Sequence, residues 1–220
     1  VEGARTVAMA DEFQLKSLLP FFATFINELG FNVKVYRNSD QAALKRGIEE
    51  ANVPFCAPMQ QFHGQASVMA EDGPDKIFIP MLRELPRVKK EKHGIVCPIV
   101  QGSPDMLKWD LGEEHRDKLV APLIQFGQGG DLEGREFIES CQRLASGLGV
   151  FTVRWWRAYQ RALEVQQAFD LDIKMLGRRA LDFCESAGIT PVVVLGRPYT
   201  IYNKVLNSNV PSILREQGSI

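Results

Sequence analysis

The sequence contains no long apolar run and no large basic cluster. No stretch reaches the ~18 consecutive apolar residues of a membrane-spanning helix, and Val1-Glu2-Gly3 does not begin a signal peptide. The formal net charge is -1 and the pI is about 6.4, which provides no positive field for nucleic acid or an anionic membrane. The short basic run Arg87–Lys90 is typical of a solvated loop. We therefore expect a cytoplasmic protein with neither nucleic acid nor membrane as partner.

The compact motifs of common metal, redox and nucleotide sites are also missing. The four cysteines are widely separated and form no C-x-x-C pair, which excludes a zinc ribbon and a thioredoxin-type motif. The three histidines show no H-E-x-x-H spacing, so a catalytic zinc site is not expected. Glycines at 127–130 match neither the phosphate-binding loop nor the dinucleotide-binding pattern and predict a simple turn.

Short apolar segments alternate along the chain with segments of helical periodicity. At 220 residues and 45% hydrophobic, the chain can bury a substantial core. The alternation predicts an α/β fold with an open parallel sheet covered by helices, Rossmann- or flavodoxin-like. The expected elements are strands at Thr6–Ala10, Phe31–Tyr36 and Lys76–Pro80, and helices at 15–29, from a cap at Ser39 or Asp40 to Ala51, and at 60–70.

Beyond the third strand the pattern predicts further elements and two changes of organisation. A brief strand is expected at Ile95–Pro98, then a helix beyond Pro104, and another helix over 132–148 after the apolar stretch 119–126. Helical periodicity over 151–187 predicts one or two connecting helices. The apolar run Pro191–Leu195 predicts a strand, followed by a helix over 212–217. We therefore expect an α/β domain over 1–150, a helical connector over 151–188 and the truncated start of a second α/β domain over 189–220.

Cys56 and Cys97 are candidate cofactor ligands because prolines flank both of them. Prolines on either side of Cys56 hold its loop extended, and Pro98 follows Cys97 directly. Thiolates on stiff loops suit an iron–sulfur cluster, and ligands of open parallel sheets bind outside the carboxyl ends of the strands. Free cysteines are also common as small buried hydrophobic residues, so both interpretations stay open. Cys141 and Cys184 lie on helical segments and fit core packing better.

Three further residues could contribute to a site. His63 follows Cys56 near the start of a helix, where it could face a ligand or donate to a cluster sulfide, or lie on the helix surface. Arg197 and Tyr199 follow the predicted strand at Pro191–Leu195, so a guanidinium and a phenol are expected at the carboxyl end of a strand. They could bind a phosphate or carboxylate, although Arg197 could equally be a structural hydrogen-bond donor.

These motifs together resemble the dehydratase-like region of CoA-substrate-specific enzyme activases. That region is related to the iron–sulfur subunits of 2-hydroxyacyl-CoA dehydratases and to double-cubane-cluster reductases. The resemblance spans most of the chain. It rests on Phe25–Phe31, Cys56–Pro58 with His63-Gly64, Val96–Ile99 with Pro104-Asp105, Gly196–Tyr199, and Asn207 with Val210-Pro211.

The resemblance implies a [4Fe–4S] or related iron–sulfur cluster as cofactor, with Cys56 and Cys97 as ligands. It implies that His63 lies next to these ligands without binding the metal itself. It implies low-potential one-electron transfer to an acyl-CoA or similar substrate, with the cluster performing the chemistry. The electrons would come from an ATP-hydrolysing activase module in the same or another chain, and ATP would bind only on that module. A third cysteine ligand would lie past residue 220, and a dimer is possible.

The chain departs from the family pattern after Tyr199. Thr200 and Asn203 stand where a histidine and an acidic residue are expected, and residues 207–210 read Asn-Ser-Asn-Val instead of an Asn-His-Gly-Ile-like segment. We therefore expect this chain, as a piece of a longer protein, to be inactive by itself. The alternative is a non-catalytic α/β module that binds a partner and holds no cluster. A small-molecule or CoA-ester binding domain that uses Arg197 without redox chemistry rests on fold analogy alone.

Overall fold

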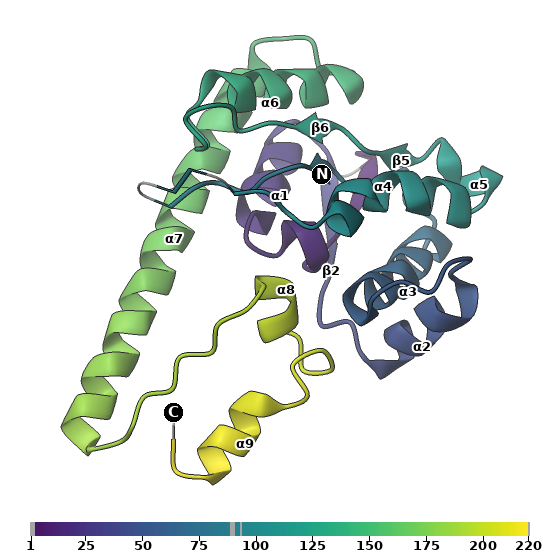
Figure 1. Ribbon diagram of the computed structural model, residues 1–220. Coiled ribbons are helices and arrows are strands. Elements are labelled where there is room, and N and C mark those ends of the chain that lie inside the picture. Colours follow the sequence, from purple (N-terminus) through teal and green to yellow (C-terminus); the bar gives the residue numbers. More distant parts are fainter. Residues whose placement is uncertain (1–2, 89–90, 93, 220) are drawn as a thin grey trace.

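A parallel sheet with helices on both faces forms the body of the molecule (Figure 1). The computed structural model describes residues 3–88, 91–92 and 94–219. Four parallel strands pair in the order β2-β1-β3-β5, and β4 and β6 form a second, two-stranded parallel sheet. The strands are β1 (Thr6–Ala10), β2 (Asn32–Tyr36), β3 (Lys76–Phe78), β4 (Met81–Leu82), β5 (Leu119–Val120) and β6 (Leu123–Ile124). The predicted α/β fold with an open parallel sheet is confirmed.

The central strands are apolar on both sides because each side faces its own hydrophobic cluster. Val7 and Met9 of β1 belong to one cluster, whereas Ala8 and Ala10 belong to the other. Strand β3 divides in the same way between the two clusters. Continuous apolar strands of this kind are typical of parallel sheets covered on both faces.

The helices begin and end close to the predicted limits. Asp40 is the cap of α2, since its side chain accepts hydrogen bonds from the amides of Ala42 and Ala43. Helix α4 starts at Pro98 and contains Pro104, so it begins earlier than predicted. The helices are the 3-10 helix η1 (Phe13–Leu15), α1 (Leu19–Glu28), α2 (Gln41–Glu50), α3 (Ala57–Glu71), α4 (Pro98–Asp110), α5 (Glu113–Arg116), α6 (Arg135–Gly147), α7 (Arg154–Ala187), α8 (Pro198–Ile201) and α9 (Val210–Glu216).

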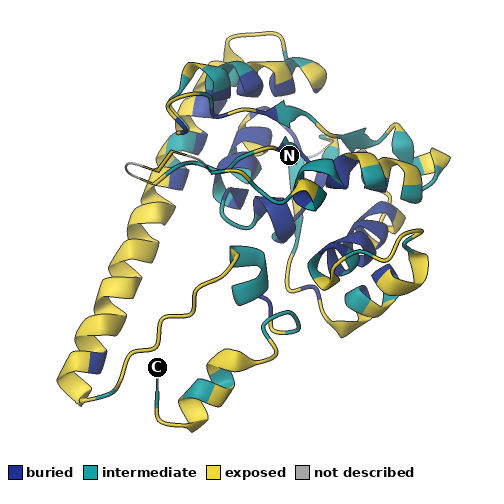
Figure 2. Ribbon diagram, viewed as in Figure 1, coloured by how far each residue is buried: buried dark blue, intermediate teal, exposed yellow. Residues whose placement is uncertain are grey.

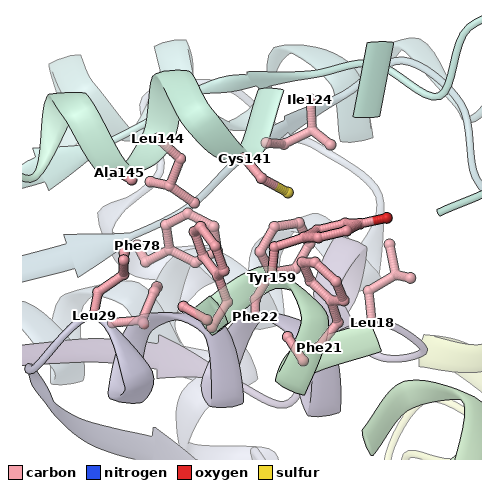
Figure 3. Close-up of a cluster of buried hydrophobic side chains, with 14 of the residues drawn as sticks. Leu18, Phe21, Phe22, Leu29, Phe78, Ile124, Cys141, Leu144, Ala145 and Tyr159 are labelled. Atoms are coloured by element: carbon pink, nitrogen blue, oxygen red, sulfur yellow. The ribbon is translucent and has the colours of Figure 1, made fainter. Parts of the chain in front are cut away.

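One face of the sheet is covered by α1, α6 and the first turns of α7, and the other by α3 and α4. Figure 3 shows side chains of the first cluster meeting from four elements: Phe21 and Phe22 of α1, Phe78 of β3, Cys141 of α6 and Tyr159 of α7. The aromatic rings contact one another, with centroids 5.3 Å apart for Phe21 and Phe22 and 5.2 Å apart for Phe22 and Phe78. This aromatic packing joins α1 to the sheet.

The connector predicted over 151–188 contains one continuous helix, α7, of 34 residues. Its first turns are buried through Ala158, Tyr159 and Ala162, which pack on α1 and α6. Its second half and the segment that follows are mostly exposed (Figure 2). The helix ends at Gly188, which takes the left-handed conformation common at helix C-termini, with φ of 64°. The division of the chain into three parts stays a prediction.

Two predicted strands are absent from the structure. Residues 191–195 form no strand, and Val193 and Leu195 are 73% and 89% exposed. A parallel strand is stabilised by pairing and by burial of both faces, and no strand of the described chain pairs with this segment. At the second site, Ile95 makes only an isolated antiparallel bridge to Glu84. Pro98, just beyond it, starts α4, because proline is well tolerated at the first position of a helix.

The basic run predicted to be a solvated loop contains one arginine with a structural role. The Arg87 side chain donates to the carbonyl oxygens of Gln128 at 2.9 Å and Gly127 at 3.1 Å, and pairs with Glu84 at 3.1 Å. It thereby holds the predicted glycine turn. The solvated-loop prediction is wrong for Arg87, whereas Lys89 and Lys90 lie outside the described residues.

None of the helices among the described residues is both long enough and apolar enough to cross a bilayer.

Candidate functional site

The sheet has one point where successive connections leave in opposite directions. The chain leaves β1 toward β2 at one edge, and it leaves β3 toward β5 at the other. Ligands of open α/β sheets bind outside the carboxyl ends of the strands at such a switch point, here between β1 and β3. Gln14, just beyond β1, donates to the carbonyl oxygen of Pro80, just beyond β3, at 3.4 Å. The switch point predicts the position of a site.

A cavity of about 320 Å³ opens at this position. Three parts of the chain line it, with residues drawn from within 13–17, 85–100 and 197–199. Most of the lining side chains are apolar, but Cys97, Arg197 and Lys16 give it a thiol and two cations. Lys16 is already paired with Asp11 at 3.3 Å. Among the described residues that line the cavity, Arg197 is the cation that forms no ion pair, and Glu91 contributes a carboxylate.

Cys97 lies half-buried at the N-terminus of α4, where it is the capping residue. Burial raises the pKa of its thiol, but the nearby Ile99 amide, Arg197 guanidinium and Val100 amide outweigh it, so that the pKa lies below the ordinary value. Free amides and the dipole of a helix N-terminus favour an anion at this position. These groups therefore stabilise the Cys97 thiolate relative to that of an unperturbed cysteine.

Arg197 and Tyr199 lie across the cavity from the body of the molecule, at the start of α8. The Arg197 Nη1 donates to the Tyr199 hydroxyl at 2.8 Å. Contacts with Tyr199 and with Cys97 raise the pKa of Arg197, which stays charged. The Tyr199 ring packs on Phe13 at 5.1 Å, and Phe13 stacks on Phe62 of α3 at 4.9 Å between centroids. These rings place Arg197 beside Cys97.

Cys56 and His63 do not line the cavity. Cys56 is exposed and caps the N-terminus of α3. His63 is buried at 1% exposure, so its interpretation as a helix-surface histidine is wrong. Its Nε2 lies 3.2 Å from Asp110 Oδ2 at the end of α4, and Asn52 donates to the other Asp110 oxygen at 2.7 Å. His63 therefore links α3 to α4.

Cys141 and Cys184 are both buried, as their placement on helical segments predicted. Cys141 belongs to the hydrophobic cluster of Figure 3, where burial raises the pKa of its thiol far above the ordinary range. Such a thiol is a poor metal ligand, because metals bind the thiolate. Cys56 and Cys97 thus remain as the two accessible thiols.

The described residues contain no group of three or more histidine, cysteine, aspartate or glutamate side chains that could hold a metal ion. An iron–sulfur cluster is commonly held by four cysteine thiolates. Cys97 and Cys56 each lie at a helix N-terminus and neither is buried, so each could supply one thiolate. The described residues do not by themselves provide the full ligand set of a cluster.

A buried polar network next to the cavity went unpredicted. It contains Glu12, Ser39, Gln61 and Asn203, which are all less than a tenth exposed. Burial raises the pKa of the Glu12 carboxyl, although Lys16 and hydrogen bonds from Ser39 and Asn203 oppose the rise. Polar residues just beyond the carboxyl end of a buried strand signal a site in open α/β sheets, and Glu12 lies two residues beyond β1, so it could have been found from the sequence.

The fold and the cavity define a doubly wound α/β protein with a thiol and a guanidinium at its switch point. Within that class, the chain belongs to the family described as CoA enzyme activase uncharacterised domain (DUF2229), whose model matches residues 6–220. The resemblance to CoA-substrate-specific enzyme activases is confirmed over nearly the whole chain. Searches of curated proteins and of solved structures gave no match.

Proposed function

We propose that the chain is the dehydratase-like iron–sulfur domain of an activase-related protein, and that Cys56 and Cys97 provide two ligands of a [4Fe–4S] or related cluster. The remaining ligands come from outside the described residues. The domain takes part in ATP-dependent, low-potential electron transfer to an acyl-CoA or similar substrate, and a separate activase module binds ATP. The position of Cys97 at the switch-point cavity, at the N-terminus of α4 and lining the same cavity as Arg197, is the observation that carries this proposal.

The residues around the cavity have distinct roles in this function. A bound cluster supplies one-electron transfer. Arg197 keeps a positive charge beside the Cys97 thiolate and can pair with an anionic group of the substrate, as can the Tyr199 hydroxyl. The rings of Phe13 and Tyr199 contact each other, with centroids 5.1 Å apart, and give the cavity an apolar side next to Arg197, which is itself exposed.

Anaerobic reconstitution with iron and sulfide tests the ligand assignment. Excess 2-mercaptoethanol is added so that small thiols can fill open iron positions. We expect the wild-type chain to bind iron and gain the brown absorbance of a cluster, and Cys56→Ser and Cys97→Ser each to lose most of it, because a serine hydroxyl is a poor iron ligand. Iron and sulfide content per chain are measured.

Cys184→Ser is the matched control, since it removes a thiol far along α7 from the cavity. It should bind as much iron as the wild type. Serine variants that keep the wild-type iron content would refute the cluster assignment. The incomplete ligand set favours a second candidate, a partner-binding module without a cluster, and that outcome would support it.

A further inference from the structure

The segment that carries Arg197 is attached to the body of the molecule by α8 and the turn that follows it. Figure 1 shows α8 beside the body, whereas α9 lies farther from it. Tyr199 contributes an aromatic contact to Phe13. The deepest attachment is polar, because Asn203 is only 3% exposed.

The amide of Asn203 makes hydrogen bonds in two directions. Its Nδ2 donates to the Ser39 carbonyl oxygen at 3.0 Å and to Glu12 Oε1 at 3.4 Å. Its Oδ1 accepts from the backbone amides of Val205 at 2.9 Å and Leu206 at 3.1 Å, which fixes the turn after α8. Asn203 therefore joins the turn to the body.

The partners of Asn203 come from three elements of the body. Glu12 follows β1, Ser39 follows β2, and Gln61 lies on α3 and donates to Asn203 Oδ1 at 3.4 Å. The partners also form hydrogen bonds with one another: Glu12 Oε1 accepts from the Ser39 amide at 3.2 Å, and Gln61 donates to the Ser39 carbonyl oxygen at 3.1 Å. Buried and mutually bonded groups of this kind specify a single arrangement.

We propose that Asn203 is a positioning residue for the cavity: through Glu12, Ser39 and Gln61 it locks residues 197–207 to the body and so keeps Arg197 beside Cys97. We call this set of hydrogen bonds the polar lock. Its role at the cavity rests on the proposed function, whereas the hydrogen bonds themselves do not depend on that function. Removing the Asn203 amide takes the side-chain acceptor from the Val205 and Leu206 amides and one donor from the Ser39 carbonyl oxygen, and leaving such groups without these partners costs more than the bond itself contributes.

The lock also accounts for an amide at a position where the family resemblance led us to expect an acidic residue. Glu12 already brings one carboxylate into this buried network, with Lys16 as its nearby cation. An aspartate at 203 would put a second carboxylate within hydrogen-bond distance of the first and would lose the donor to the Ser39 carbonyl oxygen. Two carboxylates so close cannot both ionise readily. The neutral amide is therefore the side chain that complements Glu12.

Hydrogen exchange of the metal-free chain tests the lock. Asn203→Asp and Asn203→Ala should each lower the protection of the amides in 199–207 on the order of tenfold to a hundredfold, while β1 and α1 keep theirs. The double variant Glu12→Gln/Asn203→Asp should regain part of the protection lost in Asn203→Asp, because the new amide at 12 can donate to the new carboxylate. Unchanged protection in both single variants, or no recovery in the double variant, would overturn the proposal.

A second readout separates positioning from local stability. If Asn203 acts through Arg197, the pH midpoint of Cys97 alkylation should be higher in Asn203→Asp and in Arg197→Gln than in the wild type. The midpoint of the variant that carries both substitutions should then be no higher than that of Arg197→Gln alone. Additive shifts, or no shift in Asn203→Asp, would overturn the positioning role. Both readouts use chain without metal, so evidence against the cluster would leave the polar lock unaffected.

Discussion

Phe22→Ala is expected to lower the free energy of unfolding by about 3–5 kcal/mol, a typical cost for truncating a fully buried phenylalanine. The Phe22 ring has no exposed surface and packs on Phe78 of β3, with centroids 5.2 Å apart, and on Phe137 of α6, 6.4 Å apart. Truncation would leave a cavity where α1, the sheet and α6 meet (Figure 3). Urea denaturation followed by far-ultraviolet circular dichroism measures the change.

Phe151→Ala is the matched control, because Phe151 is 80% exposed. Its unfolding free energy should stay within about 0.5 kcal/mol of the wild type, as for most surface substitutions. Equal losses in the two variants would contradict the description of the cluster as the core that joins α1 to the sheet.

Gly64→Ala is expected to destabilise the protein by roughly 1–3 kcal/mol, the usual cost of overpacking. Helices α2 and α3 cross at Gly47 and Gly64, and an added Cβ on Gly64 would lie 2.0 Å from the backbone oxygen of Ala43. A backbone oxygen cannot move aside without displacing its helix. The same would happen at Gly47, where the Cβ would lie 1.6 Å from the Gln60 oxygen. The denaturation midpoint reports the loss.

Gly177→Ala on α7 makes the same chemical change with the opposite expectation. An added Cβ there meets nothing within 4 Å. Alanine is a better helix former than glycine by about 1 kcal/mol, so stability should stay the same or rise. A Gly64→Ala variant as stable as the wild type would show that α2 and α3 do not pack as closely as described.

The elements that could be predicted from the sequence are those whose pattern agrees with their burial. β1 alternates between two apolar faces, and α2 starts at the predicted cap Asp40, so local patterning sufficed. It failed at Pro191–Leu195, because an apolar run predicts a buried strand only where other strands are present to pair with it. It failed at Ile95–Pro98 because proline favours the start of a helix as well as the end of a strand.

The candidate site could be predicted in part. Cys97 and Arg197 were each singled out from their own loops, and the fold brings them to one cavity. Cys56 was singled out by the same proline argument but does not line that cavity. The contact of His63 with Asp110 spans 47 positions, and that of Asn203 with Glu12 spans 191. Such pairings depend on how helices and strands pack, and no local pattern reveals them.

The pH dependence of Cys97 alkylation by iodoacetamide, followed at this residue by mass spectrometry, tests the site most directly. The thiolate is the reactive form, so a lowered pKa makes the residue reactive at lower pH. We predict a lower midpoint for the wild type than for a cysteine in an unstructured peptide, and a higher midpoint for Arg197→Gln than for the wild type, because the guanidinium no longer stabilises the thiolate. A wild-type midpoint at or above that of the peptide cysteine, or one that Arg197→Gln leaves unchanged, would contradict the assignment of Cys97 and Arg197 to one functional site.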